Sequence, residues 1–236
     1  MKRILLLTAS AAALIGASSA MAADLGAPKK PAALPVMAES FNPWMIRVRA
    51  LGVMPEDKSS VYLNGGLFAG SNNLAVSNSV VPELDITYFF TKNIAVELIL
   101  GTTPHTVKTS GALAGVVNTK VGSAWLLPPT LTAQYHFWLT DSIKPYVGAG
   151  VNYTFFLDEK QKGPFTGFDL KNTFGLALQA GVDVMLTKNW GINLDVKKIF
   201  LQPEYRAYTP ALGGVVVTGK AKIDPWLIGV GVTYKF

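Results

Sequence analysis

Charged side chains recur at every second position inside segments that are otherwise apolar, and they are the residues of this sequence best suited to polar chemistry. Opposite charges packed into a narrow interior should pair, because a buried charge without a partner is costly. Pairing of this kind would close the interior to solutes. The sequence therefore predicts an ionic plug, formed by Arg47, Arg49, Glu97, Asp183, Asp195, Lys197 and Lys235, with Glu83 and Asp85 reaching higher.

The residues that most often carry catalysis do not converge. The sequence contains two histidines, His105 in an expected loop and His136 in an alternating segment, and no cysteine. A metal site or a nucleophilic triad needs several convergent partners, and no G-x-S-x-G motif is present. We expect no catalytic residue, metal or cofactor. The rival is a small lipase or acyltransferase that uses His105, which mutation of His105 and an assay of lipid turnover would test.

The first 22 residues have the features of a secretory signal peptide. A basic start at Lys2-Arg3 precedes an apolar stretch over residues 4–15 and an A-x-A site that ends at Ala22. Residues 23–43 are rich in proline and indicate an extended periplasmic linker. Removal of Lys2 and Arg3 from the 21 basic residues leaves 19 against 15 acidic ones, scattered along the chain, so nucleic-acid binding is not expected.

The charged side chains must be positioned by residues 44–236. Along the segments of this range, apolar and polar residues alternate. Hydrophobic residues make up 50% of the sequence, yet beyond the N-terminus no run reaches the roughly 18 apolar residues of a spanning helix. Period-2 alternation predicts β-strands with two different faces. We predict an all-β fold, an eight-stranded antiparallel up-and-down transmembrane β-barrel, with strands at 44–54, 82–91, 93–103, 127–139, 143–156, 171–187, 190–201 and 224–236.

Within each expected strand, alternate residues share one face, and we call each such set of positions a parity. The charges fall almost entirely on one parity and the large apolar residues on the other. The segment from Trp226 to Phe236 places an apolar or aromatic residue at every second position and ends on an aromatic one. A basic residue on the lipid face would destabilise a barrel by about 2–4 kcal/mol at the bilayer midplane. A strand face in contact with lipid should therefore carry no charged residue there. A soluble lipocalin-type barrel is the structural rival, and it would put the apolar parity inside.

The expected connections alternate between short turns and long links. The turns are 91–93, 140–142 and 187–189, and the links are 55–81, 104–126, 157–170 and 202–223, rich in Gly, Asn, Ser and Pro. Short turns on one side and long loops on the other are typical of outer-membrane barrels of Gram-negative bacteria, with the short side periplasmic. We therefore expect the outer membrane as the location, with its lipid and lipopolysaccharide as partners.

The residues expected to face inward at the strand ends next to the long links are apolar. An eight-stranded barrel is just wide enough for side chains to fill it, so an open aqueous pore is not expected. These residues either line a site for a hydrophobic ligand or simply pack as a core, and the sequence leaves both readings open. They are Leu51, Val53, Ile99, Phe156, Ala177, Ile199 and Leu227.

Pro128-Pro129 is the most unusual local feature of the expected strands. Proline has no N–H, so the pair removes one ladder hydrogen bond toward each neighbouring strand. One hypothesis is a lateral exit from the lumen into the membrane. The other is that strand pairing begins only after the prolines.

Several stretches together resemble the OmpW family of small outer-membrane proteins. They include Pro145–Thr154, Gln179–Asp183, and Asp224–Trp226 closing on Tyr234–Phe236. The resemblance implies an eight-stranded barrel that passes small, mainly hydrophobic molecules inward. Outer-membrane proteins in general also suggest that Tyr234 and Phe236 are recognised by the barrel-assembly machinery. The alternative function is structural or surface interaction, as an adhesin or phage receptor, which loop replacement would separate from solute uptake.

Overall fold

The computed structural model describes residues 41–236, except residues 57, 68–73, 117, 163–165 and 211–212. The expected signal peptide (1–22) and most of the expected linker (23–43) lie outside the described residues.

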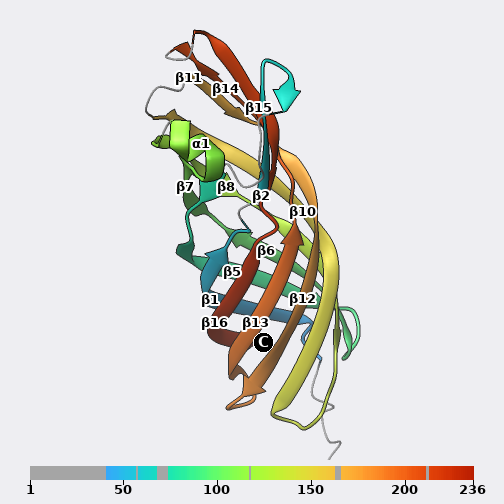
Figure 1. Ribbon diagram of the computed structural model, residues 1–236. Helices are drawn as coiled ribbons and strands as arrows, with labels where there is room; N and C mark the ends of the chain where they lie inside the picture. The colour runs from blue at the N-terminus through green and yellow to red at the C-terminus, as the bar shows by residue number, and fades with distance from the viewer. Residues whose placement is uncertain (1–40, 57, 68–73, 117, 163–165, 211–212) are drawn as a thin grey trace, which may run out of the picture. The chain divides into compact units, whose positions relative to one another are not determined.

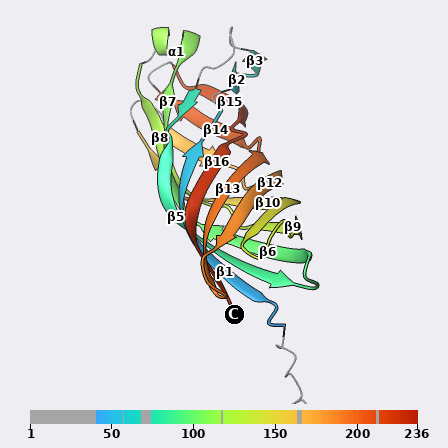
Figure 2. The same ribbon diagram turned by 90° about the horizontal axis from the view of Figure 1, so that it is seen from below.

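Eight antiparallel strands hydrogen-bond in a closed ring (Figures 1 and 2). The ring closes because β1 pairs with β16, from Met45 opposite Lys235 to Met54 opposite Trp226, and β10 pairs with β12. All eight predicted strands are present, which confirms the predicted barrel. In ring order the strands are β1 (Trp44–Met54), β5 (Ser79–Phe89), β6 (Ile94–Gly101), β9 (Thr130–His136), β10 (Ile143–Gln161), β12 (Thr173–Met185), β13 (Trp190–Phe200) and β16 (Trp226–Lys235).

The two faces of each strand follow the alternation of the sequence. Along β1, Arg47 and Arg49 are buried, whereas Val48 between them is 55% exposed. In β16, Val230 is likewise 55% exposed while Leu227 is buried. The barrel therefore carries its charges inside and its large apolar side chains outside. This is the arrangement that lipid demands and the opposite of a lipocalin-type barrel.

Two of the short turns, 91–93 and 187–189, share the sequence Thr-Lys-Asn and are fixed by its side chains. The Thr91 hydroxyl accepts hydrogen bonds from the backbone N–H groups of Asn93 and Ile94, and Thr187 does the same for its own turn. Asn93 also donates its side-chain N–H to the carbonyl of His136 at 2.7 Å. The two copies of the sequence therefore make the same bonds, and each turn is tied to the neighbouring strand.

The long links form strands, which corrects the expectation of loops. We call these residues the extension, and they gather at the end of the barrel opposite the short turns (Figure 1). Their glycine, asparagine and proline residues lie largely between short strands, so the composition hid the strands themselves. The elements are β2 (Lys58–Leu63), β3 (Gly66–Leu67), β4 (Leu74–Val76), β7 (Thr103–Thr109), α1 (Gly111–Val116), β8 (Lys120–Leu127), β11 (Thr166–Leu170), β14 (Glu204–Thr209) and β15 (Val215–Lys222).

The extension has its own hydrophobic core. Strands β8, β7 and β4 continue the barrel sheet beyond β10, and β11, β14, β15, β2 and β3 form a second sheet. Val61, Leu113, Phe168, Tyr205 and Val217 pack together between these elements. The extension is thus a packed layer rather than a set of independent loops. No helix of the described residues is long and apolar enough to cross a bilayer.

Candidate functional site

An apolar cavity of about 90 Å³ lies where the barrel meets the extension. We call it the upper cavity. Six of the seven residues predicted for the upper lumen line it, and the seventh, Ala177, is buried in the adjoining core cluster. The extension supplies further apolar lining residues that sequence reasoning missed, because it treated these segments as loops. Those residues include Leu74, Val107, Leu126, Phe168 and Tyr205.

The floor of the upper cavity is an ion pair. Lys197 and Glu83 both line the cavity, and their charged groups lie 2.9 Å apart. Lys197 also contacts a carboxylate oxygen of Asp195 at 2.9 Å. The cavity therefore ends where the charged residues of the barrel interior begin.

Eight charged side chains, including the two of this floor, fill the barrel interior beneath the cavity, and we call them the charged network. Each is at most 3% exposed. Six of the seven residues predicted for the ionic plug belong to the network, and Glu83 and Asp85 complete it. The members are Arg47, Arg49, Lys197, Glu83, Asp85, Glu97, Asp183 and Asp195.

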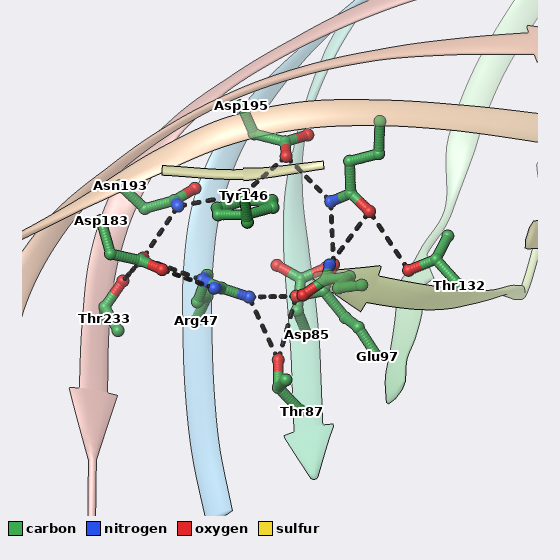
Figure 3. Close-up of polar contacts among 12 residues, drawn as sticks. Arg47, Asp85, Thr87, Glu97, Thr132, Tyr146, Asp183, Asn193, Asp195 and Thr233 are labelled. Atoms are coloured by element: carbon green, nitrogen blue, oxygen red, sulfur yellow. Dashed lines mark hydrogen bonds and ion pairs between the residues drawn. The ribbon is translucent and has the colours of Figure 1, made fainter. Parts of the chain in front are cut away.

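Arg47 joins two carboxylates from different parts of the barrel (Figure 3). Its guanidinium group donates to both oxygens of Asp183, at 3.0 and 2.6 Å, and it also binds Glu97. The two-bond geometry with Asp183 is the strong form of an arginine–carboxylate pair. Arg47 of β1 is thereby connected to β12 and β6.

Arg49 is the most connected cation of the network. Its nitrogens lie 2.8 Å from Glu83, 2.6 Å from Asp85, 3.3 Å from Asp195 and 3.6 Å from Glu97. Three strands, β5, β6 and β13, thus contribute four carboxylates to one guanidinium group. Such a charge is stable in a buried site only because its partners surround it.

Neutral polar side chains add hydrogen bonds to three of the carboxylates, those of Asp195, Glu97 and Asp183. The Tyr146 hydroxyl donates to Asp195 at 2.6 Å, and Gln134 and Gln179 each donate to Glu97 at 2.9 Å. Asn193 and Thr233 donate to Asp183 at 2.9 and 2.8 Å (Figure 3). Sequence reasoning missed these partners, although all of them occupy the inward parity.

The family model for the OmpW family matches residues 43–236, which include every strand described above. The chain belongs to the OmpW family. It is 50% identical to an uncharacterized outer-membrane protein of Sinorhizobium fredii, over 99% of this chain and 97% of the relative. It is 28% identical to the dibenzothiophene metabolism operon protein PahQ of Pseudomonas aeruginosa, over 86% and 93% of the two chains. The crystal structure of the outer-membrane protein OprG of P. aeruginosa matches with a TM-score of 0.75 and 32% identity, covering 82% of this chain and 95% of that one.

These findings establish an OmpW-family barrel of the bacterial outer membrane. Its exposed apolar strand faces therefore meet lipid, and aromatic side chains gather near the short turns, where the membrane interface lies. Trp44 packs on Tyr88 with ring centroids 4.9 Å apart, and Trp190 packs on Tyr234 at 4.7 Å.

Lys235, the seventh residue predicted for the ionic plug, lies apart from the charged network of this OmpW-family barrel. Its ammonium group is 4.7 Å from the ring centre of Phe89 and 5.4 Å from that of Trp138. These are cation–π distances. Lys235 is half-buried at the short-turn end and contacts aromatic rings instead of carboxylates.

The two histidines occupy different environments. His136 is buried in the lumen and stacks on Tyr146, with ring centroids 5.0 Å apart. His105 lies in strand β7 and lines the upper cavity, which corrects its expected position in a loop. Among the described residues, no three His, Cys, Asp or Glu side chains are arranged to hold a metal ion.

Pro128 and Pro129 interrupt the barrel wall. Strand β8 ends at Leu127 and β9 begins at Thr130, and both pair with the same strand, β10. The carbonyl of Pro128 accepts bonds from the side chains of Thr130 and Asn152, at 3.0 and 3.2 Å. Pro128 also lines the upper cavity. The break in the ladder is therefore next to the apolar space.

Proposed function

We propose that the protein admits small hydrophobic solutes through the upper cavity. The observation that carries this proposal is an apolar space at the extension end of the barrel, closed beneath by buried charges. An apolar solute gains from contact with such walls, whereas a charged solute would lose its hydration without a free partner. The name of the relative PahQ, which refers to dibenzothiophene metabolism, agrees with a hydrophobic solute.

The charged network would act as a plug in this scheme. The lumen below the cavity is filled by ion pairs whose members are at most 3% exposed. A solute could pass straight through only by separating several buried pairs, and each separation is strongly unfavourable. We therefore propose that solutes leave sideways, toward outer-membrane lipid.

A cavity-filling substitution tests the proposal. Gly101 lines the upper cavity, and a methyl group there would meet the Pro82 carbonyl oxygen at 3.5 Å, an ordinary contact. Gly101→Phe should reduce naphthalene uptake into liposomes about tenfold or more, because displacing the new ring would cost about 1–3 kcal/mol.

Leu100→Phe is the matched control for this experiment, because Leu100 is the adjacent residue on the lipid parity. It should leave uptake unchanged. Unchanged uptake in folded Gly101→Phe, or a preference of the wild-type barrel for naphthalene sulfonate over naphthalene, would contradict the proposal.

The proline pair supplies the proposed lateral exit. Pro128→Val with Pro129→Val restores two backbone N–H groups to the wall, and each new ladder bond stabilises the closed wall by about 0.5–1.5 kcal/mol. We expect severalfold slower release of naphthalene into the bilayer, with no loss of barrel stability. If a folded double variant releases solute at the wild-type rate, the prolines only mark where pairing in β9 begins.

We also propose that Tyr234 and Phe236 form an assembly signal for the barrel-assembly machinery. Their rings pack edge to face at 4.8 Å, and Phe236 is 49% exposed. Deletion of Phe236 should lower the amount of barrel inserted into the outer membrane while uptake per folded barrel stays the same. Quantitative immunoblotting of membranes and uptake by purified barrel measure the two separately. A loss of uptake per barrel at normal insertion would assign these residues to transport instead.

A further inference from the structure

We propose that His105 is the polar recognition point of the upper cavity and favours apolar solutes that carry one hydrogen-bond donor, such as an alcohol or a phenol. This inference rests on the proposed function, since it names the solute class of the same cavity. It adds a specific polar contact to walls that are otherwise mainly apolar. Pockets for small molecules commonly combine apolar walls with a few placed polar groups that fix orientation.

The His105 ring is held in a defined position at the wall of the cavity. It is 6% exposed, and its Nδ1 lies 2.7 Å from the backbone carbonyl oxygen of Ser77. Two more hydrogen bonds hold Ser77 against β7: its N–H donates to the Thr106 carbonyl, and its hydroxyl accepts from the Thr106 N–H, both at 3.0 Å. A ring fixed in this way presents its other nitrogen in one direction.

The Ser77 contact also fixes which nitrogen carries the proton. A carbonyl oxygen can only accept a hydrogen bond, so Nδ1 must be the donor and Nε2 of the neutral ring is an acceptor. Burial lowers the pKa of His105, which outweighs the opposite effect of the Ser77 contact and keeps the ring neutral near pH 7. Nε2 therefore offers a lone pair to a donor group.

The other polar groups around the cavity are largely engaged. Glu83 and Lys197 pair with each other, and the Nε2 atom of His105 has no hydrogen-bond partner among the described residues. Thr103, two residues earlier on the same buried face of β7, adds a hydroxyl group nearby. Three other lining hydroxyls donate to internal acceptors: Thr130 to the Pro128 carbonyl, Thr154 to Asn152 and Tyr205 to the Ser60 carbonyl. The Ser59 hydroxyl accepts from the Leu74 N–H at 2.9 Å.

Three ring compounds of similar size separate this contact from general apolar binding. Naphthalene has no polar group, 1-methoxynaphthalene has an acceptor only, and 1-naphthol has a donor. Binding is measured to the full barrel in lipid nanodiscs, with Gly101→Phe barrel as the blank for partition into lipid. In His105→Phe we expect 1-naphthol to bind roughly tenfold more weakly, because its hydroxyl loses its partner inside the cavity. The other two compounds should change by less than about twofold.

Thr106→Val is the control variant, because it changes the residue next to His105 on the other face of β7. It should retain wild-type affinity for all three compounds. If no compound binds the wild-type barrel, the proposed function itself fails. If the compounds bind but His105→Phe weakens all three alike, or none of them, the cavity takes solutes and the role of His105 is refuted.

A measurement on the wild-type protein does not depend on how the variant folds. The sequence has two histidines, so barrel labelled with ¹⁵N-histidine gives few ring signals. The His105 signals are those that are lost in His105→Phe and that remain in His136→Phe. We expect 1-naphthol to shift the Nε2 signal of His105 and 1-methoxynaphthalene to leave it in place. Equal shifts with both compounds, or none with either, would overturn the proposal.

Discussion

Replacement of Arg49 by methionine should lower the free energy of unfolding by about 3–5 kcal/mol, the usual consequence of removing one partner from a buried charge pair. Arg49 lies within 3.6 Å of four carboxylates. Methionine fills much of the same volume but leaves these carboxylates without their main counter-charge. Asp85 is affected most, because both its carboxylate oxygens are fully buried and it pairs with Arg49 at 2.6 Å.

Urea unfolding of barrel in lipid vesicles, followed by tryptophan fluorescence and by gel mobility, measures this effect. Arg206→Met is the matched control, since Arg206 is an exposed arginine of β14 and its loss should cost less than about 1 kcal/mol. Adding Asp85→Asn to Arg49→Met should restore part of the stability, because it removes one uncompensated charge. Equal stability of the two arginine variants would show that the charged network does not hold the barrel together.

Substitution of Gly231 by alanine should reduce the yield of folded barrel about tenfold or more. Gly231 lies opposite Arg49 at the seam where β16 closes on β1. A methyl group at Gly231 would lie 2.0 Å from the Val48 carbonyl oxygen and 2.6 Å from the Arg49 Cα. Both contacts are with backbone, which cannot move without breaking the ladder, and overpacking of this kind costs about 1–3 kcal/mol or more.

Gly229→Ala provides the comparison, because it makes the same change on the same face of the same strand. Its methyl group would meet the Arg49 Cδ at 3.1 Å, and that side chain can adjust. The folded fraction after dilution from urea into detergent, read as the heat-modifiable band on a gel, measures both variants. A folded yield for Gly231→Ala equal to that for Gly229→Ala would refute the steric argument at the seam.

The barrel could be predicted from the sequence because lipid imposes one rule on every strand. Each outward position must be apolar, so a period of two is visible without any knowledge of long-range contacts. Lys198 is the instructive exception, since it lies on the apolar parity near the end of β13. Its ammonium group binds Glu56 at 2.6 Å and lies 4.8 Å from the Trp226 ring centre. The partner comes from a link whose path the sequence does not reveal.

The interior was predictable only as far as charge is concerned. Six of the seven residues expected in the plug meet in the charged network, because opposite charges in a narrow lumen must pair. The neutral partners were not predicted, because the sequence does not distinguish a glutamine or tyrosine that binds a carboxylate from one that only fills space in the lumen. Gln179 and Glu97, for example, are 82 residues apart in sequence and meet only through the order of strands in the ring.

The extension was the largest feature that the sequence did not predict. Its strands are short, and Val61, Phe168 and Val217 find their apolar neighbours in other links rather than in adjacent strands of the barrel. Alternation within one such strand is too brief to distinguish from a loop. His105 was placed in a loop for the same reason, and its part in the upper cavity became visible only with the path of β7.

The repeated Thr-Lys-Asn turns make the two rims of the barrel unequal. Asn93 and Asn189 donate side-chain N–H groups to the carbonyls of His136 and Lys235, at 2.7 and 2.6 Å. Each hydrogen bond ties a turn to the last carbonyl of the strand beside it in the sheet, where the pairing of the strands would otherwise begin to fray. The rim at the short turns is therefore fastened by the same hydrogen bond at two places, and we expect the sheet there to resist fraying.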